Sequence, residues 1–186
     1  MKEASHPGFA IWLTGLPSAG KSTVALLLQA RLSRRGVKAQ ILDSQDLRNR
    51  LVPEIGHSHQ DRDRFYAIVC DLTAVLTARG LNVIIAATGP MRRYRDAARD
   101  KVVRFAEVHL DCDPRVCRQR NPKRLWRLGE AGAITALSDS GFPYEWPVEP
   151  EARIDTTFLC AAEAAMQIER QLQARKFFDH AAQLVS

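Results

Sequence analysis

The chain has 186 residues, 46% of them hydrophobic and 26% charged, with a formal net charge of +6. This length and composition predict one soluble globular domain with its own core, and they exclude a membrane-spanning protein, because no run approaches the ~18 consecutive apolar residues of a transmembrane helix. The positive charge favours an anionic partner. Because the basic residues are spread over many segments, we expect a small anionic molecule as that partner and no nucleic acid.

Short apolar runs alternate with longer amphipathic segments. In chain order we expect strand 9–14, helix 21–35, strand 38–43, helix 61–79, strand 82–87, helix 91–102, strand 106–111, helix 113–120, strand 152–155 and a helix from about 159 to 175. This alternation predicts an α/β fold in three layers, with a parallel central sheet flanked by helices. Residues 121–150, rich in Gly, Pro and basic side chains, predict a mobile lid, and residues 176–186 form a tail. We expect residues 1–186 to form one domain.

The strongest motif is GLPSAGKS at residues 15–22, which satisfies G-x-x-x-x-G-K-[ST] between a predicted strand and a predicted helix. In such a P-loop the glycines let backbone N–H groups converge on phosphate oxygens, and the helix N-terminus adds positive potential. Lys21 reaches the β- and γ-phosphates, and the Ser22 hydroxyl is a ligand for Mg²⁺. The motif therefore predicts ATP or GTP binding; a tight turn that matches by chance is the alternative. The expected nucleotide-binding residues here are Gly15, Ser18, Ala19, Gly20, Lys21, Ser22 and Thr23.

Two carboxylates lie at the end of the second predicted strand and just beyond it. We expect Asp43 to bind Mg²⁺ with Ser22 and to orient metal-bound water or the acceptor; the alternative is that it only caps a helix. Asp46 is a second candidate for the catalytic carboxylate. Together with Lys21, which offsets phosphate charge, these groups predict direct in-line phosphoryl transfer without a covalent enzyme intermediate.

Motifs over residues 9–156 resemble those of adenylylsulfate (APS) kinases. The segment FAIWLTGLPSAGKST at 9–23 resembles the family's W-L-T-G-L-S-G-A-G-K-S-T opening. Further matches, in family order, are Leu42-Asp43 with Arg48, Ser58 with Asp61-Arg62, Thr88-Gly89-Pro90 before Arg92, Arg120 with Lys123, and Pro143-Tyr144-Glu145.

The resemblance implies a P-loop kinase that uses Mg·ATP to phosphorylate the ribose 3′-hydroxyl of APS, or of a related small anionic acceptor. It also implies that the chain forms a homodimer. In this interpretation Arg120 and Lys123 close over the ATP base and phosphates. The acceptor-binding residues implied are Arg48, Arg62, Thr88, Gly89, Pro90 and Lys123.

The departures from the family motifs gather in the acceptor half. Gln45 stands where the family's D-G-D has its second aspartate, and Phe65 stands where D-R-x-x-N-I-R-R has asparagine. Ala67 and Ile68 replace the two arginines of that motif, and Gly89 replaces a serine. Because such polar contacts give a site its discrimination, two alternatives remain: a kinase of a different nucleotide or sugar acceptor, and a nucleotide-binding pseudoenzyme.

Cysteine use and the N-terminus bear on location. Residues 1–8 hold no apolar segment typical of a secretory signal, and the four cysteines form no C-x-x-C pair. We expect reduced thiols in a cytoplasmic protein. His57 and His59 have no third ligand in their segment, so a metal site there is not expected.

Overall fold

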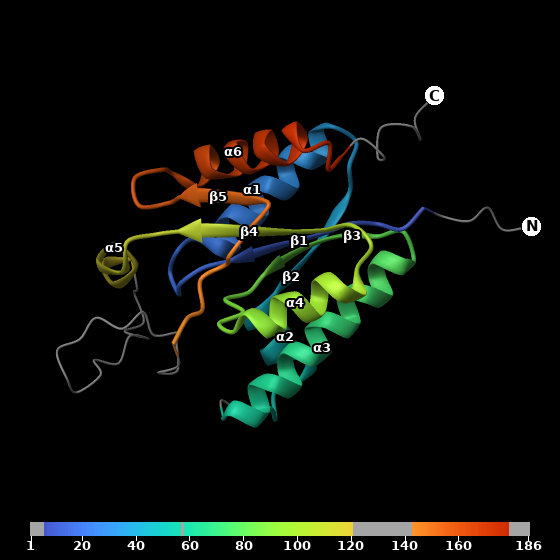
Figure 1. The fold of residues 1–186 in the computed structure, drawn as a ribbon, viewed down its shortest axis with the longest axis vertical. Helices are drawn as coiled ribbons and strands as arrows, with labels where there is room; N and C mark the ends of the chain where they lie inside the picture. The colour runs from blue at the N-terminus through green and yellow to red at the C-terminus, as the bar shows by residue number, and fades with distance from the viewer. Residues whose placement is uncertain (1–5, 57, 121–142, 179–186) are drawn as a thin grey trace, which may run out of the picture.

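Within the part of the chain that the structure describes, five strands form one parallel sheet in the order β2-β3-β1-β4-β5 (Figure 1). The computed structural model describes residues 6–56, 58–120 and 143–178. The strand bounds are β1 Ala10–Thr14, β2 Ala39–Asp43, β3 Asn82–Ala86, β4 Phe105–Asp111 and β5 Ala152–Asp155. Because β3 pairs with both β2 and β1, the carboxyl ends of β2, β3 and β1 lie side by side.

Helices cover both faces of the sheet (Figure 1), so the predicted three-layer α/β fold is confirmed. One face carries α1 and α6, and the other carries α2, α3 and α4, while α5 follows the carboxyl end of β4. Their bounds are α1 Lys21–Arg34, α2 Ser44–Leu51, α3 His59–Ala78, α4 Arg92–Lys101, α5 Pro114–Gln119 and α6 Ala161–Ala174.

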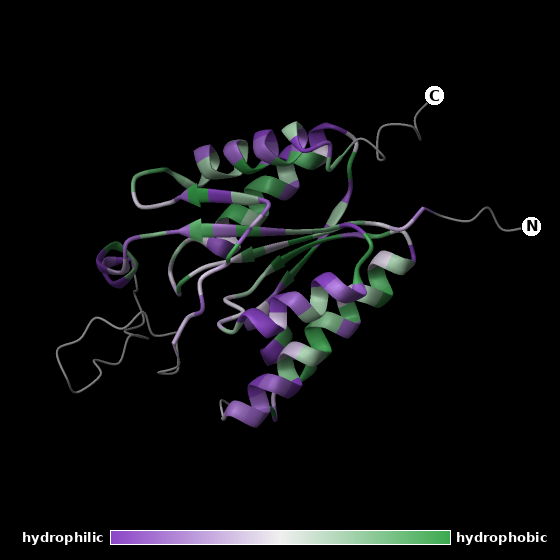
Figure 2. Ribbon diagram, viewed as in Figure 1, coloured by the Kyte–Doolittle hydropathy of each residue, from purple (hydrophilic) through white to green (hydrophobic). Residues whose placement is uncertain are grey.

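The core is split into two layers by the sheet, as the green faces of the helices turned towards it show (Figure 2). Along β1, Ile11 and Leu13 pack with α1 and α6, while Ala10 and Trp12 pack with α3 and α4. All five residues of β1 are buried, and the first four, AIWL, form the apolar run that is typical of a strand covered on both faces.

All ten predicted elements are present, and each begins and ends within two residues of its predicted bounds. Among the described residues, one further helix, α2, was not predicted. Helix α2, SQDLRNRL, has no buried residue, so it lacks the apolar periodicity that reveals a helix in sequence. Asp43 starts it as N-cap. Helix α3 begins at His59 because Ser58 and Asp61 form a capping box.

The start of the predicted tail belongs to the core. Phe177 and Phe178 each pack edge-to-face against Phe9, with ring centroids 5.4 and 5.6 Å away. Residues 179–186 lie outside the described part. None of the helices within the described ranges is long and apolar enough to cross a bilayer.

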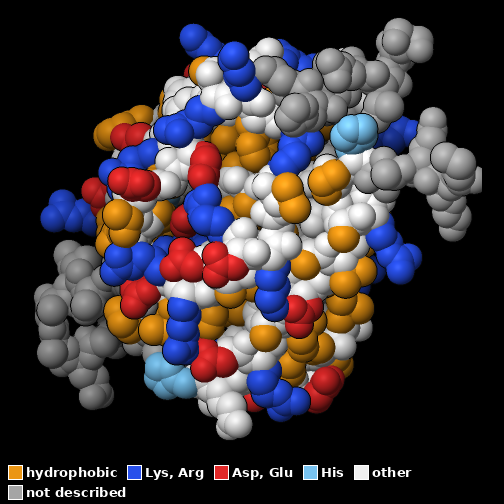
Figure 3. All heavy atoms as spheres, turned by 45° about the vertical axis from the view of Figure 1, so that its right-hand side comes forward, with side chains coloured by type: hydrophobic (Ala, Val, Ile, Leu, Met, Phe, Trp, Pro, Cys, Tyr) orange, Lys and Arg blue, Asp and Glu red, His pale blue; other side chains and the backbone are white. Residues whose placement is uncertain are grey.

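Charges of both signs mix on the surface. On the face drawn in Figure 3, lysine and arginine side chains alternate with aspartate and glutamate, and no single basic patch forms. The four cysteines are free thiols in the structure, with Cys70, Cys112 and Cys117 buried and Cys160 exposed.

Candidate active site

The P-loop joins β1 to α1 and passes close to β4. Gly15 has a φ of 145°, and a Cβ there would lie 2.5 Å from the carbonyl oxygen of Leu110, so only glycine fits this close approach. Ser18 adopts the left-handed region with a φ of 64°, at a place where the family opening has glycine. Such strained backbone is found at ligand-binding loops.

Lys21 opens α1 and its ammonium turns back into the loop. Its Nζ donates to the carbonyls of Gly15 at 3.0 Å and Leu16 at 2.8 Å. The ammonium and the positive N-terminal end of α1 therefore lie at the loop that the motif assigns to phosphate.

Asp43 is both a helix cap and a partner of the P-loop. Its Oδ1 accepts the backbone N–H of Gln45 at 2.8 Å, and its Oδ2 accepts the Ser22 hydroxyl at 2.5 Å. One oxygen of Asp43 therefore caps α2, as the alternative interpretation predicted, and the other contacts the P-loop. The chemistry of this pair fits Mg²⁺, because hydroxyl and carboxylate oxygens are the donors that this ion prefers.

Arg48 and Arg62 lie together between α2 and α3. The guanidinium of Arg48 stacks 3.9 Å above the centroid of the Phe65 ring and donates to the Gly56 carbonyl at 3.0 Å. Burial lowers the pKa of Arg48, and the nearby charge of Arg62 lowers it further. Arg62 is only 7% exposed. Two arginines held this close suit an anionic ligand.

Phe65 and its neighbours explain part of the departure from the family motif. Phe65 is 1% exposed, and the face of its ring packs against the guanidinium of Arg48. It therefore affects the site by positioning that arginine. Ala67 and Ile68 lie on the exposed side of α3.

Residues Thr88, Gly89 and Pro90 follow β3, between the ends of β2 and β1. The Gly89 N–H donates to the Tyr66 hydroxyl at 3.1 Å. Burial raises the pKa of Tyr66 to about 12, so this hydroxyl stays protonated.

Arg120 ends α5 and is tied to the segment after β5. Its guanidinium donates to the carbonyls of Thr156 at 2.8 Å and Thr157 at 3.1 Å. The adjacent Phe158 is 88% exposed. Lys123 and residues 121–142 of the predicted lid lie outside the described residues.

The structure thus brings Lys21, Ser22 and Asp43 together. Gln45 and Asp46 lie in the first turn of α2 with exposed side chains. Sequence reasoning assigned no site role to four residues at this end of the sheet: Thr14, Tyr66, Arg95 and Tyr144. Each lies in, or just beyond, a segment that matches a family motif, and this match was the only signal for them.

Buried His109 is expected to make the stability of the fold depend on pH. It is buried on β4 against Tyr144 and Trp146, and neither ring nitrogen has a hydrogen-bond partner among the described residues. Burial, and then the charges of Arg153 and Arg95, lower its pKa to about 3. In the unfolded chain the imidazole takes up a proton near pH 6.5, whereas in the folded chain it does so only near pH 3. The free energy of unfolding therefore has its full value above pH 6.5 and falls as the pH drops from 6.5 towards 3.

When the pH is lowered from 7.5 to 5, we expect the free energy of unfolding to fall by about 2 kcal/mol because of His109. Urea denaturation at the two pH values measures this fall. The control is His109→Phe, which keeps a ring beside Tyr144 but carries no titrating proton. An equally steep loss of stability in the variant would contradict this assignment.

Comparison with known proteins gives consistent matches. A family model described as adenylylsulphate kinase matches residues 7–155. The probable adenylyl-sulfate kinase of Pyrococcus abyssi is 35% identical over 164 residues, or 88% of this chain and 94% of the relative. The adenylyl-sulfate kinase of Shewanella amazonensis is 38% identical over 157 residues, 83% of this chain and 79% of the relative. The solved Mycobacterium tuberculosis APS kinase, in complex with AMPPNP and APS, matches with a TM-score of 0.78 at 31% identity, covering 90% of this chain and 98% of that chain.

Proposed function

Because the chain belongs to the adenylylsulphate kinase family, we propose that it transfers the γ-phosphoryl group of ATP to the 3′-hydroxyl of APS. The observation that carries the proposal is the contact between the P-loop and the end of β2, where the Ser22 hydroxyl meets Asp43. This contact places the phosphate-binding loop beside the carboxyl ends of β2 and β3, where an acceptor can reach the γ-phosphoryl group.

The reaction needs positioning and charge stabilisation more than covalent chemistry. The acceptor oxygen forms a bond to the γ-phosphorus as the bond to the β-phosphate oxygen breaks, and the hydroxyl proton leaves to a carboxylate or to water. Lys21 offsets the charge on the transferred group, and we assign Arg120, which is tied to the segment after β5, to the nucleotide base. Ser22 and Asp43 would hold Mg²⁺, which neutralises phosphate charge when bound.

Arg48 and Arg62 supply the anion-binding half. We assign them to the charged phosphosulfate end of the acceptor, because both are held by packing and lie on the Asp43 side of the site. We assign Thr88, Gly89 and Pro90, which follow the end of β3 beside β2, to the acceptor as well. The cytoplasmic location and the homodimer remain parts of this proposal; sedimentation of the purified chain checks the latter.

The direct test incubates the protein with Mg²⁺, γ-labelled ATP and APS. Label in 3′-phosphoadenosine 5′-phosphosulfate is the expected result. A panel of other nucleotides and sugars in place of APS serves as comparison, and label transfer to one of these but not to APS would reject the proposed acceptor.

The second candidate, a kinase of another anionic nucleotide or sugar, is favoured by Gln45. This side chain is exposed in the first turn of α2, beside Asp43, and an amide cannot take up the acceptor proton. The pseudoenzyme alternative is less well supported, since the Lys21–Ser22–Asp43 group is complete.

Gln45→Asp is expected to raise kcat/KM for APS about 10- to 100-fold, since a carboxylate at this place can accept the hydroxyl proton. Steady-state kinetics with varied APS measures the effect. Gln45→Asn, which shortens the side chain equally but stays neutral, is the matched control and should give no gain. A Gln45→Asp variant that is no better with APS would favour another acceptor.

A further inference from the structure

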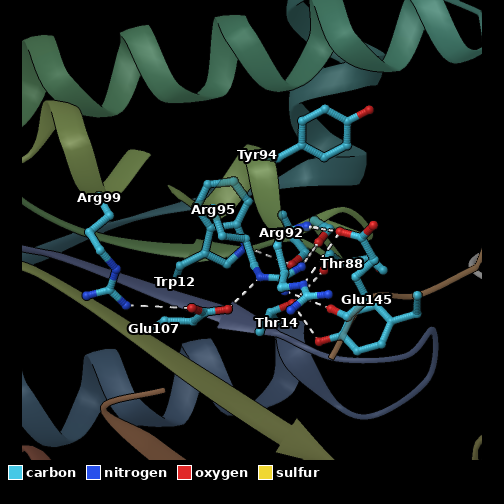
Figure 4. Close-up of polar contacts among 12 residues, drawn as sticks. Trp12, Thr14, Thr88, Arg92, Tyr94, Arg95, Arg99, Glu107 and Glu145 are labelled. Atoms are coloured by element: carbon cyan, nitrogen blue, oxygen red, sulfur yellow. Dashed lines mark hydrogen bonds and ion pairs between the residues drawn. The ribbon is translucent and has the colours of Figure 1, made fainter. Parts of the chain in front are cut away.

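The loop after β3, residues 87–90, is fixed through its carbonyl groups (Figure 4). The first two are held from β1. The Ala87 carbonyl accepts the Trp12 indole N–H at 3.0 Å, and the Thr88 carbonyl accepts the Thr14 hydroxyl at 2.6 Å. The loop is therefore tied to the strand that leads into the P-loop.

The next two carbonyls are held from outside β1. That of Gly89 accepts a hydrogen bond from Nη1 of Arg95, and that of Pro90 accepts the backbone N–H of Glu145 at 2.7 Å. Four consecutive carbonyls of loop 87–90 thus have partners. Such a loop keeps one shape, because releasing any buried carbonyl leaves an unpaired polar group.

Arg95 is the centre of this arrangement. It is 1% exposed on α4, and its guanidinium contacts three segments at once. Nε donates to Glu107 on β4 at 2.5 Å, Nη1 to the Gly89 carbonyl, and Nη2 to the Glu145 carbonyl at 2.7 Å. Glu107 compensates the buried charge, and the planar fork of arginine lets one side chain serve all three partners.

The hydroxyl groups of Tyr144 and Thr14 form a second set of hydrogen bonds that holds loop 87–90. Because Thr14 uses its one hydroxyl proton for the Thr88 carbonyl, the Tyr144 hydroxyl must donate to Thr14, 2.9 Å away. Burial raises the pKa of Tyr144 well above its usual value, so this proton stays in place. Two neighbouring residues thus hold the same loop: Tyr144 acts through Thr14, and Glu145 bonds to the Pro90 carbonyl directly.

The backbone of loop 87–90 leaves little freedom to rearrange. Gly89 has a φ of 50°, and a Cβ there would meet the Trp12 ring at 3.0 Å and Arg95 Cγ at 3.2 Å. The loop lies between the P-loop and the end of β2, where Asp43 is.

We propose that Arg95, backed by Glu107, is a positioning residue for the acceptor: it holds loop 87–90 in the shape that binds the acceptor beside the P-loop. This inference rests on the proposed function, in which Thr88, Gly89 and Pro90 bind APS. It concerns the acceptor half only, since the hydrogen bonds of Arg95 among the described residues go to Glu107, Gly89 and Glu145 and not to the P-loop.

The test compares Arg95→Lys with Arg99→Lys. Lysine keeps the charge beside Glu107, but its N–H donors all leave from one nitrogen, so it cannot span Glu107 and the Gly89 and Glu145 carbonyls as the three guanidinium nitrogens do. Arg99, one turn later on α4, pairs with Glu107 and Glu151 and donates to no group of loop 87–90 among the described residues. It is therefore a matched control for the same ion-pair network.

We expect Arg95→Lys to raise KM for APS about 10- to 100-fold while KM for ATP stays near its original value. Arg99→Lys should leave both constants unchanged. An unchanged KM for APS, an equal rise in KM for ATP, or the same effect in Arg99→Lys would overturn the inference.

A second readout does not depend on the acceptor. Hydrogen exchange at the Gly89 and Glu145 amides, which donate to Tyr66 and to the Pro90 carbonyl, should speed up in Arg95→Lys and not in Arg99→Lys. If the original protein does not phosphorylate APS, the proposed function falls, and this exchange result alone decides whether Arg95 fixes the loop; unchanged exchange refutes it.

Should Arg95→Lys fail to fold, Thr14→Val and Thr14→Ser replace it. Valine removes the hydroxyl that holds the Thr88 carbonyl, and serine keeps it. Faster exchange at Gly89 and a raised KM for APS in the valine variant alone support a loop held by these contacts. Equal behaviour of the two variants counts against it.

Discussion

Replacing Lys21 with Ala lowers kcat by about 10²- to 10³-fold, the loss that follows removal of one preorganised donor from a transition state. The ammonium lies inside the P-loop, held at 3.0 and 2.8 Å by the Gly15 and Leu16 carbonyls. No neutral side chain can offset charge on the transferred phosphoryl group from this position. Initial rates at saturating ATP and APS measure the loss.

Lys101→Ala is the matched control for this variant. Lys101 ends α4 and pairs with Asp71 at 2.5 Å on the surface, so its removal should leave turnover unchanged. Nucleotide affinity of the Lys21 variant, measured by calorimetry with an ATP analogue, should also fall. Unchanged affinity together with unchanged turnover would refute the assignment of the P-loop.

The elements of the fold were predictable because each carries a local signal. Strand β3, NVIIA, is a continuous apolar run, and α3 repeats its buried residues at helical spacing. Helix α2 had no such signal, since its residues are polar and none is buried. Its start is determined by the cap at Asp43, which the sequence offered only as an alternative to metal binding.

The P-loop could be recognised in the sequence for the same reason. Residues 15–22 are contiguous, and the motif states the role of each side chain. The contacts that shape the acceptor half join distant positions: Thr14 and Tyr144 are 130 residues apart, and Thr14 and Thr88 are 74 apart. Arg95 lies on a helix and Glu107 on a strand, and the sequence pattern does not show that these two side chains point towards each other. Only the tertiary structure brings these residues together.

Asp43→Asn is expected to reduce kcat about 10²-fold or more, while Asp46→Asn leaves it near the original value. Asparagine caps helices as well as aspartate does, so the bond from the Gln45 N–H is retained and α2 stays in place. What the variant loses is the negative charge at the oxygen that accepts the Ser22 hydroxyl, the place where Mg²⁺ would be held.

The pair of variants identifies which carboxylate serves the reaction. Asp43 contacts the P-loop, whereas Asp46 is exposed in the first turn of α2. Both variants should unfold at nearly the same temperature as the original protein, because the cap is kept and Asp46 is exposed. Raising the Mg²⁺ concentration should recover part of the activity of Asp43→Asn, since the carboxylate lost there is the group proposed to hold Mg²⁺. If Asp46→Asn instead shows the larger loss of kcat, Asp46 is the catalytic carboxylate, and Asp43 serves to cap α2 and to hold the Ser22 hydroxyl.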